Sequence, residues 1–109
     1  MIHKQIEKLI PYIGDNFISY QLSKEGVYIP FITLTKYIGI NETIDDLQAK
    51  LEEFLTPNNY EFEVNRIGRN MYECLAYPSF YNKEDHSYEF KKDDWSLEEL
   101  IELLIQSFK

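Results

Sequence analysis

Carboxylate side chains are concentrated in one stretch of the sequence, residues 41–55. Apolar residues recur there at helical spacing, so the polar residues point outward as a group: Glu42, Asp45, Asp46, Gln48, Glu52 and Glu53. Carboxylates presented together attract a basic partner, because Lys and Arg pair with them and opposite charges steer association. We predict that this face binds a partner. An ordinary solvated helix face is the alternative, and direct reading of DNA is the least favoured.

The two arginines of the chain stand close together. Arg66 and Arg69 lie between Asn65 and Asn70 in the segment NRIGRN. Arginine pairs with phosphates and enters narrow minor grooves of DNA. These four residues are therefore a candidate nucleic-acid contact. The alternative is that the arginines pair with nearby acids or stay in solvent.

The other reactive residue types form no catalytic or metal-binding pattern. His3 and His86 lie far apart, and neither stands at metal-ligand spacing from Cys74. Asp93 and Asp94 precede a predicted helix, where they favour its dipole. Phosphate-binding and dinucleotide-binding glycine patterns are absent from the sequence. We predict a protein that is not an enzyme and that needs no metal or cofactor.

A helix over residues 41–55 is expected to carry the acidic face. Its apolar residues follow steps of three and four: Ile44, Leu47, Leu51, Phe54 and Leu55. Asn41 is the expected N-cap, and Pro57 stops the helix. A shorter helix is expected just upstream, ending at Gly39 and built on Thr33, Leu34, Tyr37 and Ile38.

Strands are expected on both sides of these helices. Residues 27–31 are short, β-branched and aromatic. Phe62 and Val64 alternate with Glu61 and Glu63, which is the period of a half-buried strand. Residues 65–70 form the expected turn, with Gly68 at positive φ, and residues 71–77 return as the second strand.

The pattern GVYIP…LTKYIGINETIDDLQAKL followed by a hairpin resembles the winged helix-turn-helix family over residues 26–78. The resemblance implies an α+β fold with a winged-helix-like core. Residues 35–40 would end the scaffold helix, residues 41–55 would form the recognition helix, and residues 60–77 would form the wing. The family's usual partner is DNA. This sequence departs from that pattern, since its recognition helix would bring five carboxylates to the phosphates.

Composition favours one packed domain of 109 residues with a formal net charge of −8. An acidic chain repels nucleic acid and attracts basic partners. One cysteine and the lack of a long apolar run indicate a cytoplasmic protein that does not enter membranes. Richness in Ile, Lys, Tyr, Asn and Glu is associated with AT-rich genomes, which include many phages and mobile elements.

The domain is expected to have three parts. Residues 1–25 form N-terminal helices, the first on Ile2, Ile6, Leu9 and Ile10, with a loop at residues 23–26. Residues 26–78 form the core. Residues 79–109 form a loop, a short strand at 88–90 and a C-terminal helix capped by Ser96. The apolar stripe of that helix packs on the core or, as the alternative, on a second copy in a homodimer.

Two functions follow. The first is a non-enzymatic acidic regulator or inhibitor that occupies a basic nucleic-acid-binding site on a protein. In size and charge such a chain resembles the small inhibitors made by phages, such as anti-CRISPR proteins and DNA mimics. The second is a winged-helix transcriptional regulator that binds DNA through the arginines of the wing. Tyr72, Tyr77, Phe80 and Tyr81 are a candidate aromatic patch for either partner.

Overall fold

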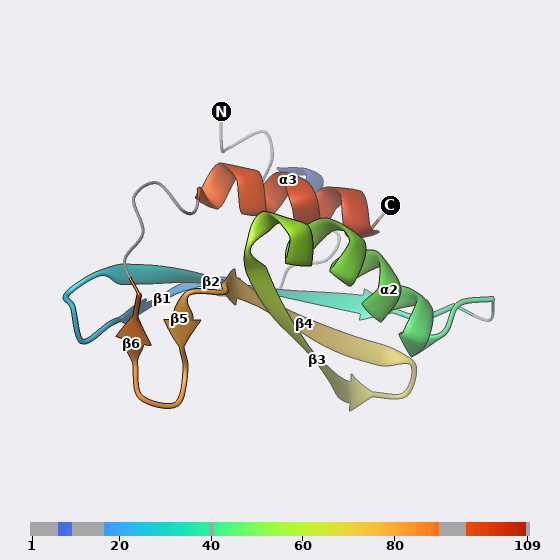
Figure 1. Cartoon of the computed structure of the whole chain (residues 1–109). Helices are drawn as coiled ribbons and strands as arrows, with labels where there is room; N and C mark the ends of the chain where they lie inside the picture. Colours follow the sequence, from blue (N-terminus) through green and yellow to red (C-terminus); the bar gives the residue numbers. More distant parts are fainter. Residues whose placement is uncertain (1–6, 10–16, 40, 90–95, 109) are drawn as a thin grey trace.

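The computed structural model describes residues 7–9, 17–39, 41–89 and 96–108, which form an antiparallel sheet covered by helices (Figure 1). The elements, in chain order, are β1 (Ile18–Leu22), β2 (Tyr28–Tyr37), α2 (Ile44–Leu55), the 3₁₀ turn η2 (Thr56–Asn58), β3 (Tyr60–Gly68), β4 (Met71–Pro78), β5 (Tyr81–Asn82), β6 (Ser87–Tyr88) and α3 (Leu97–Phe108). Residues 7–9 are also helical. The main sheet has the order β1-β2-β4-β3, and β5 pairs with β6 separately.

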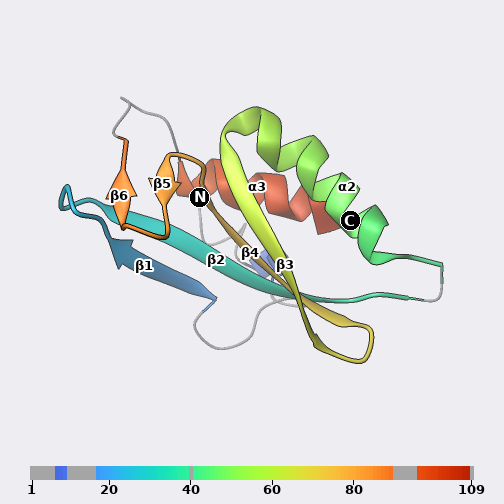
Figure 2. The ribbon, with the colours of Figure 1, turned by 60° about the horizontal axis from the view of Figure 1, so that its bottom comes forward.

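The middle of the main sheet is covered on both faces. Helices α2 and α3 lie side by side over one face, as Figures 1 and 2 show. Ile32 and Leu34 of β2 and Cys74 of β4 are buried against them. The β5–β6 hairpin covers part of the opposite face, where Phe31 and Tyr81 belong to a second buried cluster. Successive strand residues point to opposite faces, so β2 supplies side chains to both layers.

The short helix expected over residues 33–38 is wrong, because β2 continues to Tyr37. Thr33 and Thr35 are β-branched and suit a strand. Their neighbours Ile32 and Leu34 are fully buried, which is the two-residue period of a strand. This half of β2 pairs with β4 residue by residue, from Ile32 to Tyr37. Pairing with a strand about 40 residues away therefore outweighed the weak helical spacing.

The winged-helix-like core is consequently wrong as well. A helix-turn-helix needs a helix before α2, but the segment before α2 is strand β2, which pairs with β1 on one side and β4 on the other. The expectation that residues 1–25 form only helices is also wrong, since residues 18–22 form β1. The first expected helix, from Ile2 to Ile10, lies outside the described residues except at 7–9. The fold is α+β and mostly sheet.

Helix α2 lies where its spacing predicted, with a different N-cap. Thr43, rather than Asn41, caps the helix: its Oγ1 accepts a hydrogen bond from the Asp46 N–H at 3.1 Å. Oδ2 of Asp46 in turn accepts one from the Thr43 N–H at 3.0 Å. This reciprocal pair is a capping box. One carboxylate of the predicted acidic face is therefore used by the helix itself.

The hairpin expected over residues 60–77 is present as β3 and β4, which pair from Tyr60↔Pro78 to Gly68↔Met71. The register shifts between Arg66 and Gly68, which marks a bulge. The left-handed residue of the turn is Asn70, with φ of 58°, and not Gly68 as expected. Asparagine is among the few side chains that adopt this conformation readily.

The C-terminal helix α3 was predicted correctly, and its apolar stripe packs in the core: Leu100, Ile101, Leu104, Ile105 and Phe108 are buried. Its first turn is fixed by Tyr60, whose side chain is 2% exposed. The Tyr60 hydroxyl donates to the Ser96 carbonyl at 2.9 Å and accepts from the Ser96 N–H at 3.0 Å. A homodimer through α3 remains a prediction, with little exposed apolar surface on the helix to carry it.

Replacing Tyr60 with Phe should lower the free energy of unfolding by about 1–3 kcal/mol, because it leaves both backbone groups of Ser96 without the hydroxyl. Urea denaturation followed by circular dichroism measures the change. Tyr37→Phe is the control, since Tyr37 is 61% exposed and should tolerate the loss of its hydroxyl. Equal stability of the two variants would show that Tyr60 does not fix α3.

The same tyrosine makes stability sensitive to alkaline pH. Burial raises the pKa of Tyr60 from its ordinary value of 10.0 to about 12. Between these values the folded chain keeps a proton that the unfolded chain has released, so stability falls as pH rises through this window, by at most about 2–3 kcal/mol. Tyr60→Phe should lose less stability than wild type between pH 9 and 12. Parallel losses in the two proteins would contradict this origin.

Candidate functional site

The outward face of α2 is acidic, as the sequence predicted. Glu42, Asp45, Glu52 and Glu53 are exposed, and Gln48 is half-buried. The Glu42 carboxylate lies 3.8 Å from Nζ of Lys36 on β2. The helix thus presents carboxylates along its length, but its surface is convex.

The hairpin tip carries the other predicted set. Asn65, Arg66, Arg69 and Asn70 are all exposed around the β3–β4 turn. The Arg66 Nε donates to the Gly68 carbonyl at 3.2 Å, which holds the guanidinium beside the bulge. Neither arginine forms an ion pair with a described residue. The structure therefore places both arginines in solvent at the tip of the hairpin.

A concave acidic surface lies elsewhere, on the face of the sheet opposite the helices. Glu61 and Glu63 of β3 are exposed there, because Phe62 and Val64 point to the core. The strand register sets Glu61 opposite Tyr77 of β4. Carboxylates of the edge strand therefore stand next to an aromatic ring of the central strand.

The β5–β6 hairpin forms the opposite wall of this surface. Phe31 of β2 anchors the hairpin: its ring stacks on Tyr77 with centroids 5.1 Å apart and meets the edge of Tyr81 at 5.5 Å. The Tyr81 hydroxyl lies 2.9 Å from Nδ1 of His86, which ties the two ends of the hairpin turn. In addition, the carboxylate of Glu25, between β1 and β2, accepts a hydrogen bond from the Tyr88 N–H. Aromatic packing thus fixes a short hairpin that could not stand alone.

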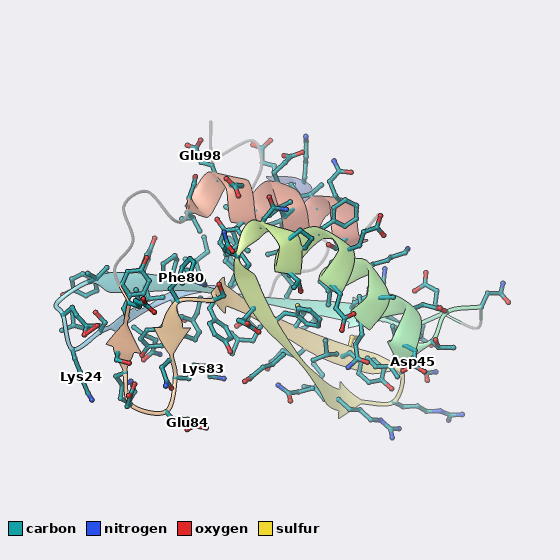
Figure 3. All side chains as sticks on the ribbon, in the orientation of Figure 1. Lys24, Asp45, Phe80, Lys83, Glu84 and Glu98 are labelled. Carbon is teal, nitrogen blue, oxygen red and sulfur yellow. The ribbon has the colours of Figure 1, made fainter. Side chains whose placement is uncertain are left out.

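Between the two walls lies a hollow of about 750 Å³, which we call the acidic groove. Its lining combines carboxylates, aromatic rings and one base: Glu61, Glu63, Glu84 and Glu89, with Tyr77, Phe80 and Tyr81, Lys83, and Ser79 and Asn82. Figure 3 shows Phe80, Lys83 and Glu84 together on the hairpin, with Asp45 of α2 at the other end of the molecule. The groove is therefore separate from the N-terminal part of the acidic helix face.

Lys83 shows how the acidic groove holds a cation. Its Nζ lies 2.6 Å from Oε1 of Glu63 and 5.3 Å from the centroid of the Tyr77 ring. A carboxylate and an aromatic face therefore hold one ammonium group together, which is the combination that binds basic side chains. The carboxylates of Glu61, Glu84 and Glu89 line the rest of the groove, and Lys83 is the only base among the lining residues that the structure describes.

Electrostatics inside the groove agree with an excess of negative charge. Burial, together with the carboxylates of Glu63 and Glu61, raises the pKa of Tyr77. The neutral ring offers its face to a cation.

A second hollow of about 520 Å³ continues the acidic surface toward α2. It is lined by Glu52, Thr56, Pro57, Glu61 and Phe62, so it shares Glu61 with the acidic groove. Of the acids predicted on α2, Glu52 alone lines this hollow. The C-terminal end of the helix face and the groove thus form one connected negative strip.

Sequence reasoning missed the groove residues as a site. The alternation of Glu61 and Glu63 was interpreted only as the solvent side of a strand, Glu84 as part of a polar loop and Glu89 as part of a short strand. The aromatic patch predicted from Tyr77, Phe80 and Tyr81 is present in part, because these rings line the groove. Tyr72 lies apart from them and packs against the main core.

The single cysteine is not placed to act as a nucleophile. Burial raises the pKa of Cys74 to about 12, and its side chain is 1% exposed, which leaves the thiol protonated and inaccessible. Among the residues with described positions, no group of three or more His, Cys, Asp and Glu could hold a metal ion. The groove offers charge and ring faces for binding.

Comparison with family models, with curated proteins and with solved structures gives no match to this chain. None of the described helices is long and apolar enough to cross a membrane.

Proposed function

We propose that this chain is a non-enzymatic acidic regulator or inhibitor that binds a basic site on a protein partner, a site that normally holds nucleic acid. The acidic groove carries the proposal, because its described lining combines four carboxylates with three aromatic rings and a single base. A cytoplasmic location accompanies it, supported by the single, buried and unpaired Cys74.

The groove suits an arginine or lysine side chain of the partner. Lys83 already occupies one such position, between Glu63 and Tyr77. A guanidinium entering beside it meets Glu61 or Glu89 and can stack on an aromatic ring. Because the groove is concave, these contacts lose water and gain strength compared with those on the convex face of α2.

The acids of α2 extend this negative surface beyond the groove. Glu52 joins the helix face to the groove through the hollow that it shares with Glu61. With a net charge of −8, the chain attracts basic surfaces over several ångströms and accelerates their association. Small phage inhibitors such as anti-CRISPR proteins and DNA mimics act through charge of this kind, and we place this chain with them as a functional class.

Two charge-reversed variants separate the groove from the helix. The first carries Glu61→Lys and Glu84→Lys, both exposed in the groove. The second carries Asp45→Lys and Glu53→Lys on α2, which spares Asp46 and its capping box. Each changes the formal net charge from −8 to −4, so the two are matched in total charge. Fluorescence anisotropy of a labelled arginine-rich peptide measures binding at low and at moderate salt.

We expect the groove variant to raise the dissociation constant at least tenfold, about 1.4 kcal/mol, and the helix variant only about threefold. Added salt should weaken binding by wild type. Equal effects of the two variants would show that total charge alone attracts the peptide. If the groove variant bound the peptide as tightly as wild type, the groove would not be the binding site. Displacement of duplex DNA from a basic DNA-binding domain by the chain then tests the inhibitory role.

Nucleic-acid binding through the hairpin tip is the second candidate function, supported by the exposure of both arginines there. It no longer includes a recognition helix, since the winged-helix arrangement is absent. If the tip binds DNA, Arg66→Ala with Arg69→Ala should abolish a gel shift that wild type gives with random duplex at low salt. The absence of a shift for wild type would discard this candidate, as would a shift that the double variant retains.

A further inference from the structure

Strand β1 forms an unprotected edge of the main sheet. It pairs with β2 on one side, and no described element pairs with its outer side (Figure 2). Its sequence, ISYQL, contains no charged residue, proline or glycine. The opposite edge strand, β3, carries Glu61, Glu63 and Arg66 and a bulge, which are the usual protections against pairing with another chain. Strand β1 itself carries none of these protections.

Large apolar side chains are exposed beside this edge. Tyr20 and Leu22 of β1 are each 54% exposed, and Tyr28, which faces Leu22 across the β1–β2 pair, is 64% exposed. Ile18 shares their face of the strand and packs against the main core. The exposed row therefore continues the helix-covered face of the sheet toward its free edge.

The outer backbone groups of β1 follow from its register with β2. The Thr33 N–H donates to the Phe17 carbonyl at 2.8 Å, so the odd-numbered residues of β1 exchange hydrogen bonds with β2. The even-numbered residues Ile18, Tyr20 and Leu22 consequently direct their N–H and C=O groups outward. These groups are a template for one more antiparallel strand.

We propose that a second copy of this chain binds there, β1 against β1, with a two-fold axis at Tyr20. Ile18 then faces the partner's Leu22, Tyr20 faces the partner's Tyr20, and Ser19 faces the partner's Gln21. Apolar residues meet apolar residues on one face and polar residues meet polar ones on the other. The Tyr20 pair is a hydrogen-bonded pair, as its outward backbone groups require.

A second copy suits this edge because β1 can pair with itself without bringing like charges together. Each copy carries a net charge of −8, so most faces repel when two copies meet. The uncharged β1 edge lets their backbones approach without opposing carboxylates. The main sheets of the two copies become one continuous sheet, with β3 and the acidic groove at each outer end. The dimer thus presents two grooves to a partner. Formation of the dimer does not depend on what the grooves bind.

A cysteine at the axis tests the register. Paired Cα atoms at such a position lie about 5.5 Å apart, within disulfide range. Tyr20→Cys should therefore form a disulfide-linked dimer under mild oxidation. Ser19→Cys is the matched control: two such residues lie about 8 Å apart diagonally, too far for a disulfide. Because Cys74 is buried, it should not form disulfide-linked dimers of its own. Equal cross-linking of both variants, or none in either, would overturn the register.

Sedimentation velocity between about 1 μM and about 1 mM tests association without cross-linking. Wild type should shift from monomer to dimer across this range, because a five-residue edge gives a weak dimer. Tyr20→Lys should raise the dissociation constant at least about tenfold, since two lysines meet at the axis. Tyr37→Lys, at a similarly exposed tyrosine of β2, should leave the dissociation constant unchanged. Wild type that stays monomeric throughout would overturn the proposal.

Discussion

The structure depends on burial of the β2–β4 pair between two apolar layers. Even-numbered residues of this pair, such as Leu34 and Cys74, pack against α2 and α3. Odd-numbered residues, such as Phe31 and Tyr77, pack against or beside the β5–β6 hairpin. The strand period of two assigns every side chain to one layer or the other. With the middle of the sheet closed on both faces, surface for recognition remains at the two edge strands and the helix exteriors.

The acidic groove is a consequence of this arrangement. The hairpin packs on Phe31 near the middle of the sheet and stops short of the outer strand, so β3 keeps one solvated face beside it. Glu61 and Glu63 occupy that face, with the aromatic rings that anchor the hairpin as their neighbours. The same rings therefore hold the fold together and line the groove. This coupling explains why the groove combines carboxylates with aromatic faces.

In one part of the chain, the sequence did not distinguish a strand from a helix. Residues 27–38 contain apolar side chains at both odd and even positions because β2 is buried on both faces, and such a run fits a strand and a helix alike. The spacing of Leu34, Tyr37 and Ile38 then favoured a helix. The run of β-branched residues was the signal for a strand. The partner that settled the choice, β4, lies about 40 residues further along the chain.

By itself, the sequence determined the presence and approximate bounds of α2, α3 and the β3–β4 hairpin, because the periodicity of apolar residues within each segment is sufficient to define it. It did not determine the N-cap of α2 or the left-handed residue of the hairpin turn. The sequence also determined the excess of negative charge and the acids on α2. Tertiary structure alone decided that residues 18–22 and 33–37 are strands and that residues 61–63 and 77–89 share a groove. The physical reason is that these features arise from strand pairing and aromatic packing between segments far apart in the sequence, which local patterns alone do not settle.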